Sequence, residues 1–244
     1  MIIFNDGVVD AEIYFRELQN DIQVINLNVS NAGTVRAMSM EYLAAQSSID
    51  KIVFQDIDDK LSDNRMQVAL DALDSFQLVC NDLSTFDDFG VTPSIWEKRL
   101  GDAFNFDVQF ISNKNIVGLG NSAVQCSLLR QQFKHSDSVI AYDWFLFYQW
   151  MKQANSTGVF TTQCQTLYRQ HQNNIAGAGN MVSKEKLLHV LNVKNRHYSE
   201  LIRFGFHELK TEMAALQNKK EQIENTSIIQ STTSLFWWEA TELL

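Results

Sequence analysis

Apolar residues occur along the first 80 residues in runs of two kinds. Short, continuous apolar runs at residues 1–4, 22–27, 51–54 and 77–80 are typical of buried strands. Between these runs, apolar side chains recur at helical spacing, in residues 10–18, in residues 34–46 and after Ser62 or Asp63, either of which could cap a helix. A chain in which strands alternate with helices predicts an α/β fold.

The pattern beyond residue 81 is less regular until a long helical tail begins. In order, it predicts a loop or mobile lid (82–101), an extended segment (106–111), a helix (122–133), a buried aromatic helix (139–153), a strand (158–163) and a polar loop (168–180). Residues 183–225 are charged and helical in spacing. We therefore predict an α/β domain over residues 1–180 and a C-terminal helical extension over residues 181–244.

Composition narrows the class of protein. The 244 residues are 45% hydrophobic, enough for a sizeable core, and the net charge is −9. Nucleic-acid binding proteins need a basic surface, so we predict no nucleic-acid partner. The three cysteines are far apart and fit neither a metal motif nor a disulfide framework, which favours a reducing, cytoplasmic location. The sequence shows no signal peptide and no apolar run long enough for a membrane helix.

The third apolar run ends in an acidic cluster, FQDIDDKLSDNR (54–65). In an extended chain Asp56 and Asp58 would share one side, and Asp59 would point elsewhere unless the chain turned. A divalent cation would relieve the repulsion among these carboxylates, since Mg²⁺ takes one or two carboxylates together with water and phosphate oxygens. The structural alternative is a solvated acidic turn that caps a helix. Ligands of α/β sheets bind at the carboxyl ends of strands, which is where this cluster falls.

Two further residues have side chains suited to catalysis or metal binding. Asp143 lies in the aromatic run YDWFLFYQWM, where burial would raise its pKa toward the range of a general base. His171 would be neutral and able to bind a metal at pH 7. Gly118-Leu119-Gly120 is a GxG turn that could lie close to an acceptor.

Four motifs in sequence order resemble the family-two glycosyltransferases of the GT-A fold, in their bacterial rhamnosyltransferase-like branch. The acidic cluster is similar to the DxD region of that family. Asn5-Asp6-Gly7 resembles its "DDGS" turn, and Asn31-Ala32-Gly33 with Arg36 resembles the turn and helix before DxD. Tyr142-Asp143-Trp144, followed by the YRQH of residues 168–171, resembles "HDWW…YRQH". The similarity covers residues 1–180 and implies a mixed, Rossmann-like sheet flanked by helices.

The resemblance implies roles for a set of polar residues. They are Asp6, Arg36, Asp56, Asp58 and Arg169 for a nucleotide sugar, Asp58, Asp59 and His171 for a metal ion, and Asp143 as the catalytic base. The metal would be Mg²⁺ or Mn²⁺, and the choice between Asp58 and Asp59 as its ligand stays open. The implied reaction is inverting transfer of a sugar from a nucleotide-diphosphate donor to a saccharide or lipid-linked saccharide, in bacterial O-antigen or capsule synthesis.

The sequence departs from that family at its start, because the family opens with a strand and helix before the region matched by residues 1–10. The first strand of the family is therefore missing from the match, and a catalytically degenerate domain that binds a sugar nucleotide or a protein partner is the main alternative. A metal-dependent nucleotidyltransferase is a third. Phe236, Trp237 and Trp238 in the tail favour packing or a homodimer through the C-terminal helices, and leave open a peripheral contact with the inner face of the membrane.

Overall fold

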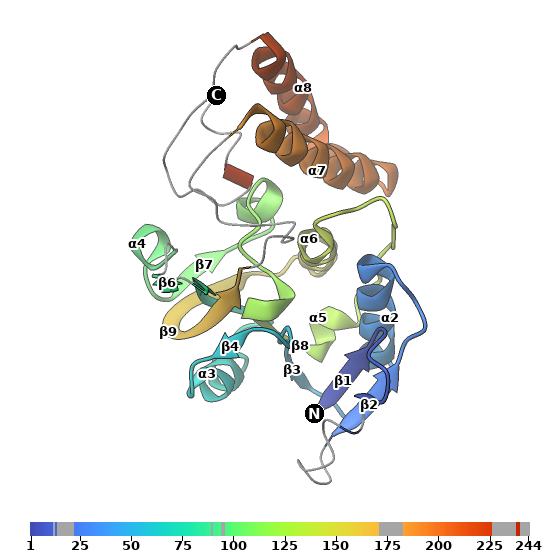
Figure 1. The fold of residues 1–244 in the computed structure, drawn as a ribbon, viewed down its shortest axis with the longest axis vertical. Helices are drawn as coiled ribbons and strands as arrows, with labels where there is room; N and C mark the ends of the chain where they lie inside the picture. The colour runs from blue at the N-terminus through green and yellow to red at the C-terminus, as the bar shows by residue number, and fades with distance from the viewer. Residues whose placement is uncertain are drawn as a thin grey trace.

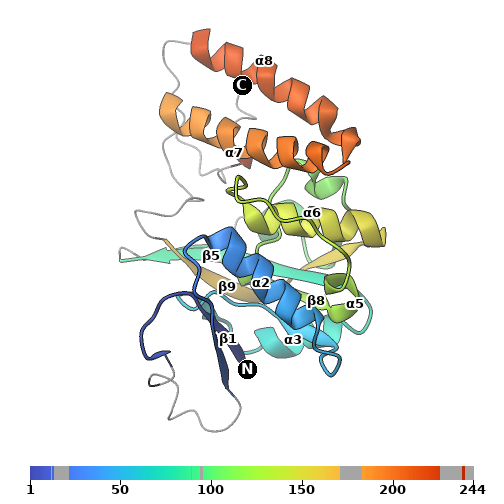
Figure 2. The same cartoon turned by 90° about the vertical axis from the view of Figure 1, so that its right-hand side faces the viewer.

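The structure is a computed structural model, and it describes residues 1–11, 13, 22–88, 90–93, 96–170, 183–225 and 238–239. The elements form layers (Figures 1 and 2): α3 covers one face of a central sheet, α2 and α6 cover the other, and α7 and α8 stack beyond α6. This is a mixed α/β fold with a sheet flanked by helices, as the sequence predicts.

The central sheet has the strand order β3-β8-β5-β9-β4, with β6 paired to β5 and β7 paired to β9. Its strands are β3 (Lys51–Val53), β4 (Lys60–Leu61), β5 (Leu78–Asp87), β6 (Gly90–Thr92), β7 (Phe104–Phe106), β8 (Ser122–Gln125) and β9 (Gly158–Arg169). β5 and β9 run parallel, while β8 is antiparallel to both β3 and β5. The carboxyl ends of β3 and β9 therefore point the same way.

A second, two-stranded sheet pairs β1 (Ile2–Asn5) with β2 (Gln23–Asn26) in parallel. It packs on α2 (Ala32–Ala44), where the ring of Phe4 meets that of Tyr42 edge-on at 5.7 Å and Gln23 donates a hydrogen bond to the Tyr42 hydroxyl. Residues 1–4 and 22–27 are thus strands, as predicted, and residues 34–46 are largely helical. The helix predicted over residues 10–18 lies mostly outside the described residues.

The core lies on both faces of the central sheet. On β5, Leu78 and Cys80 belong to the main core, whereas Val79 belongs to a smaller cluster under α3, as the two-residue period of a strand requires. The main core is dominated by α6 (Tyr142–Ala154), whose Trp144 and Phe145 are almost fully buried. The buried aromatic helix predicted over residues 139–153 is confirmed.

Two predicted segments are wrong. Residues 82–101 are not a loop: β5 continues to Asp87, pairs with β9 along that length, and is followed by β6 and α4 (Trp96–Leu100). Residues 122–133 are not one helix, because residues 122–125 form β8 between β3 and β5, and only α5 (Cys126–Leu129) is helical. In both cases pairing with distant strands overrides a weak local pattern.

Smaller differences concern element boundaries. Asn64, rather than Ser62 or Asp63, precedes the first residue of α3 (Arg65–Ala72). Arg65 is 1% exposed whereas Met66 is 51% exposed, so α3 buries a cation where its pattern predicted an apolar residue. Residues 106–111 are extended only at their start, since β7 ends at Phe106 and a 3₁₀ turn, η2 (Phe110–Ser112), follows.

The C-terminal part contains α7 (Lys184–Arg203), a 3₁₀ turn η4 (His207–Leu209) and α8 (Lys210–Asn225). The helical tail predicted from residue 183 is confirmed, and its buried side chains join the same core as α6. Trp238 stacks on Trp96 at 5.6 Å with an interplanar angle of 6° and is 3% exposed, which agrees with a packing role. Phe236 and Trp237 lie outside the described residues. Within the described part of the chain, no helix has the length and hydropathy of a membrane span.

Candidate active site

Three carboxylates gather around one short turn, η3 (Leu119–Asn121), which directly precedes β8. A Cβ atom on Gly120 would lie 2.9 Å from Asp56 Oδ2 and 2.9 Å from Asp59 Oδ2. The next residue back, Leu119, donates its backbone N–H to Asp143 Oδ2 at 3.0 Å. The glycine is needed here because any side chain would occupy the space between the first two carboxylates.

Asp56 and Asp59 are brought together by a turn directly after β3. The backbone N–H of Asp59 donates to Asp56 O at 3.3 Å, so the chain does not stay extended and the alternation expected from the sequence does not hold. Asp59 is 6% exposed, whereas Asp58 between them is exposed. The carboxylates of the half-buried Asp56 and the buried Asp59 converge on Gly120, and Asp58 lies outside that convergence.

Burial disfavours the charged forms of Asp56 and Asp59. Desolvation, followed by the charge of Asp143, raises the pKa of Asp56 to about 6. Desolvation raises the pKa of Asp59 to about 7, against the opposing effect of the Arg169 backbone N–H, which donates to Asp59 Oδ1 at 2.9 Å. Asp59 Oδ2 is buried and accepts no hydrogen bond among the described residues. An orphaned carboxylate oxygen beside a second carboxylate is a place where a cation would lower the free energy.

Asp143 lies in the first turn of α6, where the helix dipole favours a negative charge. Its Oδ2 accepts from Leu119, and its Oδ1 lies 3.1 Å from Arg36 Nε in an ion pair. The same Oδ1 is buried and makes no hydrogen bond of acceptable geometry among the described residues. The pair is therefore held by charge rather than by a well-aligned hydrogen bond.

Arg36 reaches Asp143 because α2 and α6 approach each other closely. Asn31 caps α2 through its side chain, which accepts from the Thr34 backbone N–H at 3.1 Å. A Cβ atom on Gly33 would lie 3.0 Å from the Tyr142 ring, so the missing side chain lets the start of α6 pack against α2. The Asn-Ala-Gly turn seen in the sequence thus positions Arg36.

Tyr168 is a site residue that the sequence analysis did not single out. Burial, and then the charges of Asp59, Asp56 and Asp143, raise the pKa of its hydroxyl to about 12, so the phenol keeps its proton beside the carboxylates. The next residue, Arg169, has its guanidinium 5.2 Å from the ring centre of Phe86. Successive strand residues point to opposite faces, so Tyr168 faces the cluster and the Arg169 side chain does not. The sequence feature that could have identified Tyr168 is its place as the first residue of the YRQH motif.

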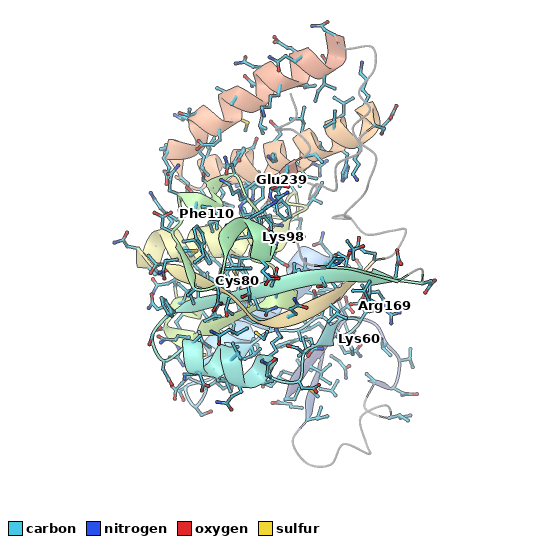
Figure 3. The ribbon with its side chains drawn as sticks, turned by 90° about the vertical axis from the view of Figure 1, so that its left-hand side faces the viewer. Lys60, Cys80, Lys98, Phe110, Arg169 and Glu239 are labelled. Carbon is cyan, nitrogen blue, oxygen red and sulfur yellow. The ribbon has the colours of Figure 1, made fainter. Side chains whose placement is uncertain are left out.

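Lys60 joins Arg169 on the far side of the sheet. Its Nζ lies 4.9 Å from the centre of the same Phe86 ring, and Figure 3 shows Lys60 and Arg169 close together at one end of the sheet. The phosphate role predicted for Arg169 stays a prediction; in this structure its backbone N–H donates to Asp59 Oδ1 and its guanidinium lies over Phe86.

Arg65 is buried beneath the acidic cluster and holds two of its segments together. Its guanidinium donates to Phe54 O at 2.9 Å, to Gly120 O at 3.2 Å and to Asn81 Oδ1 at 2.7 Å. It thereby ties the end of β3 to the turn at Gly120. No feature of the sequence indicated this role, because an arginine after an acidic cluster is usually solvated.

The predicted site residues thus divide into three groups. The structure brings Arg36, Asp56, Asp59 and Asp143 together. Asp6 lies in the exposed turn after β1, and Asp58 is exposed beside the cluster. His171 lies outside the described residues.

The donor set fits a divalent metal ion in part. Asp56 and Asp59 offer two converging carboxylates with one orphaned oxygen, which matches the one or two protein ligands that Mg²⁺ takes when phosphates and water supply the rest. No group of three or more His, Cys, Asp or Glu side chains among the described residues forms a metal site by itself. A cation here would therefore depend on ligands from a substrate.

Comparison with known proteins bears on the fold. No protein-family model matches the sequence, and no curated protein matches it. Among solved structures, the fold is similar to that of S. aureus TarS residues 1–349, with a TM-score of 0.52, 13% identity, and coverage of 81% of this chain and 62% of that one. A longer TarS structure gives a TM-score of 0.52 at 14% identity, covering 81% and 38%. A197 from STIV has a TM-score of 0.41 at 13% identity, covering 68% and 82%, which is too low to bear on the fold.

TarS is a glycosyltransferase of the GT-A type, so the fold predicted from the four motifs is confirmed. At this level of identity the likeness concerns the fold alone. The chain spans less than two thirds of the length of either TarS chain. The rhamnosyltransferase-like branch stays a prediction.

Proposed function

We propose that this protein is an inverting glycosyltransferase that moves a sugar from a nucleotide-diphosphate donor to an acceptor hydroxyl. The observation that carries the proposal is the convergence of Asp56, Asp59 and Asp143 on the turn at Gly120, next to the carboxyl end of β3 in a fold shared with a glycosyltransferase. A pair of carboxylates at Gly120 and a third at Leu119 suit a displacement at an anomeric carbon, in which the pair would hold a cation for the leaving group and the third would take the proton of the acceptor.

In the proposed reaction, Asp143 takes the proton from the acceptor hydroxyl. The acceptor oxygen forms a bond to the anomeric carbon while the bond from that carbon to the phosphate oxygen breaks. The nucleoside diphosphate leaves with the electron pair of that bond, and one displacement inverts the anomeric centre. Arg36 and the hydroxyl of Tyr168 lie where they can donate hydrogen bonds to the charged oxygens.

Asp56 and Asp59 would hold Mg²⁺ or Mn²⁺, with Asp58 as an outer ligand. The ion would supply positive charge against the leaving diphosphate. Because the two carboxylates have raised pKa values, the ion would replace protons as it binds. Asp6 and Arg169 remain candidate contacts to the nucleotide, and His171 remains a candidate metal ligand.

The acceptor we propose is a saccharide or lipid-linked saccharide of a bacterial surface polysaccharide, such as O-antigen or capsule. Donor and acceptor would meet in the cytoplasm, with the inner face of the membrane as the source of a lipid-linked acceptor. The resemblance of the sequence motifs supports this part of the proposal.

The experiment is transfer or donor hydrolysis with a panel of UDP-, dTDP- and GDP-sugars and Mn²⁺, comparing wild type with Asp143→Asn. We expect the variant to bind donor but to lose at least 100-fold in turnover, since a positioned base contributes about 10²–10⁴. Asp74→Asn is the matched control, because Asp74 is an exposed aspartate paired with Lys51 at the other end of β3. Equal turnover in wild type and Asp143→Asn would remove Asp143 from the reaction.

A second candidate function is a catalytically degenerate domain that binds a sugar nucleotide without transferring the sugar. One observation favours it: both oxygens of Asp143 are engaged, one by Leu119 and one by Arg36, so neither is open to an acceptor hydroxyl. Nucleotide binding without turnover on any sugar donor, in wild type, would support this candidate.

A further inference from the structure

Arg36 lies between the two acidic parts of the site. Its nearest anion is Asp143, which raises the pKa of Arg36 most strongly, and burial opposes that effect. Asp56 also raises the pKa of Arg36, so the guanidinium is within electrostatic reach of the Asp56–Asp59 pair as well. A single cation therefore serves two groups of carboxylates.

The bond that holds Arg36 to Asp143 is not a strong one. The Nε–Oδ1 distance is 3.1 Å, but Oδ1 has no hydrogen bond of acceptable geometry among the described residues. The two side chains keep 31% and 17% of their surface exposed, so water screens the attraction in part. Asp143 also keeps a second contact, to the Leu119 N–H, that does not involve Arg36.

A diphosphate is a better partner for a guanidinium than this carboxylate. It presents several anionic oxygens and allows two parallel N–H···O bonds, which the present contact with Asp143 lacks. A donor whose phosphates approach Asp56 and Asp59 at Gly120 would come within reach of Arg36, because Arg36 pairs with Asp143, which is held by the neighbouring Leu119 N–H.

We propose that Arg36 exchanges partners when a nucleotide-diphosphate donor binds: it leaves Asp143 Oδ1 for the phosphate oxygens and so frees that oxygen for the acceptor hydroxyl. This inference rests on the proposed function and adds to it a coupling between the two substrates. Without donor, Arg36 occupies Asp143 Oδ1 and keeps an acceptor hydroxyl from that oxygen. With donor, Asp143 is held only by Leu119 and is released as a base.

The exchange makes an unusual prediction for binding. If Asp143 competes with the donor for Arg36, then Asp143→Asn removes the competitor and strengthens donor binding, although it abolishes transfer. A purely structural role for the ion pair predicts unchanged or weaker binding. The effect should also vanish when Arg36 is absent.

The test is isothermal titration of UDP, dTDP and GDP, each with Mn²⁺, into wild type, Asp143→Asn, Arg36→Gln and the double variant. For the nucleotide that wild type binds best, we expect Kd to fall roughly fivefold in Asp143→Asn and to rise roughly tenfold in Arg36→Gln. In the double variant Kd should equal that of Arg36→Gln alone, since without the guanidinium there is nothing to release.

Controls separate this inference from folding and from the proposed function. Asp74→Asn also breaks an Asp–cation pair and should leave Kd unchanged. Circular dichroism and thermal unfolding check that each variant folds, and Asp143→Ser replaces Asp143→Asn if the latter does not. Unchanged or weaker binding in a folded Asp143 variant overturns the partner exchange alone. No binding of any nucleotide by wild type overturns the proposed function, and the exchange with it.

Discussion

Two buried polar groups meet at the turn of residues 119–121, and they are built in opposite ways. On one side, the guanidinium of Arg65 is surrounded by acceptors: the carbonyls of Phe54 and Gly120 and the side chain of Asn81. On the other side, Asp59 Oδ2 lies against a second carboxylate with no hydrogen-bond donor among the described residues. Arg65 Nε and Nη2 thus find acceptors within the chain and only its Nη1 is buried without one among the described residues, whereas Asp59 Oδ2 has no donor there at all.

This difference separates structural from functional burial. A buried charge whose partners come from the chain itself is tolerated in the fold without a ligand, because its hydrogen bonds offset much of the cost of burial. A buried carboxylate without a partner raises the free energy of the fold and persists where a ligand supplies the missing charge. The raised pKa values of Asp56 and Asp59 have the same origin, because burial disfavours the charged form of each carboxyl group.

The largest effect should come from the hydrogen bonds of Arg65. Arg65→Met would remove the hydrogen bonds to Phe54 O, Gly120 O and Asn81 Oδ1, and we expect the free energy of unfolding to fall by about 3–5 kcal/mol. Urea denaturation measures this loss. Arg65→Lys, which keeps a charge but not the planar set of donors, should fall in between. A loss under about 1 kcal/mol for Arg65→Met would contradict the view that the hydrogen bonds of Arg65 hold the end of β3 to the turn at Gly120.

The buried carboxylate of Asp59 should make the stability of the protein depend on pH. The folded-state pKa of Asp59 is raised to about 7, so its contribution is greatest at low pH and is lost as pH rises from about 4 through 7. In buffer free of divalent cations we expect the free energy of unfolding to be about 2 kcal/mol lower at pH 8 than at pH 5 from this group.

Asp59→Asn tests that assignment, since the amide keeps an acceptor for the Arg169 N–H and carries no charge. The variant should be more stable than wild type at pH 8 and should lose most of the difference between the two pH values. A pH profile parallel to that of wild type would mean that Asp59 is not the source of the pH dependence of stability.

Gly120→Ala should affect the Asp56–Asp59 pair more than it affects the contacts of Arg65. The new Cβ atom would lie 2.9 Å from both Asp56 Oδ2 and Asp59 Oδ2 and would push the carboxylates apart. We expect Mn²⁺ binding in the presence of nucleotide to weaken at least tenfold, with a stability loss of only about 1–2 kcal/mol. In Gly118→Ala, where the closest contact is 3.3 Å, Mn²⁺ binding should change less.

The smallest stability effect should come from Tyr168 and Arg169. Comparing them separates a side chain that faces the carboxylates from one that does not. Tyr168→Phe removes a half-buried hydroxyl that faces the carboxylates and should change stability by less than about 1 kcal/mol while weakening nucleotide binding several-fold. Arg169→Met removes a guanidinium stacked on Phe86 and should weaken nucleotide binding less. The reverse order of effects on Kd would restore the phosphate role predicted for the Arg169 side chain.

Much of this could be predicted from local pattern. The strands of residues 1–4, 22–27 and 51–54, the helix of residues 34–46 and the buried helix around Asp143 all follow from periodicity, because burial of one face selects the same positions in any context. The sequence also located acids at the carboxyl end of β3. The elements it missed, the far half of β5 and all of β8, are those whose structure depends on pairing with distant strands.

The sequence by itself determined which residues could be strands, which could be helices, and that carboxylates cluster at one strand end. Only the tertiary structure decided which carboxylates face each other: a turn brings Asp59 rather than Asp58 beside Asp56, and Arg169, 110 residues away, holds Asp59 in place. It also decided that Arg36 pairs with Asp143 and that Arg65 is buried. The physical reason is that periodicity records which face of an element is buried, whereas the partner of a charge depends on the approach of segments far apart in the chain.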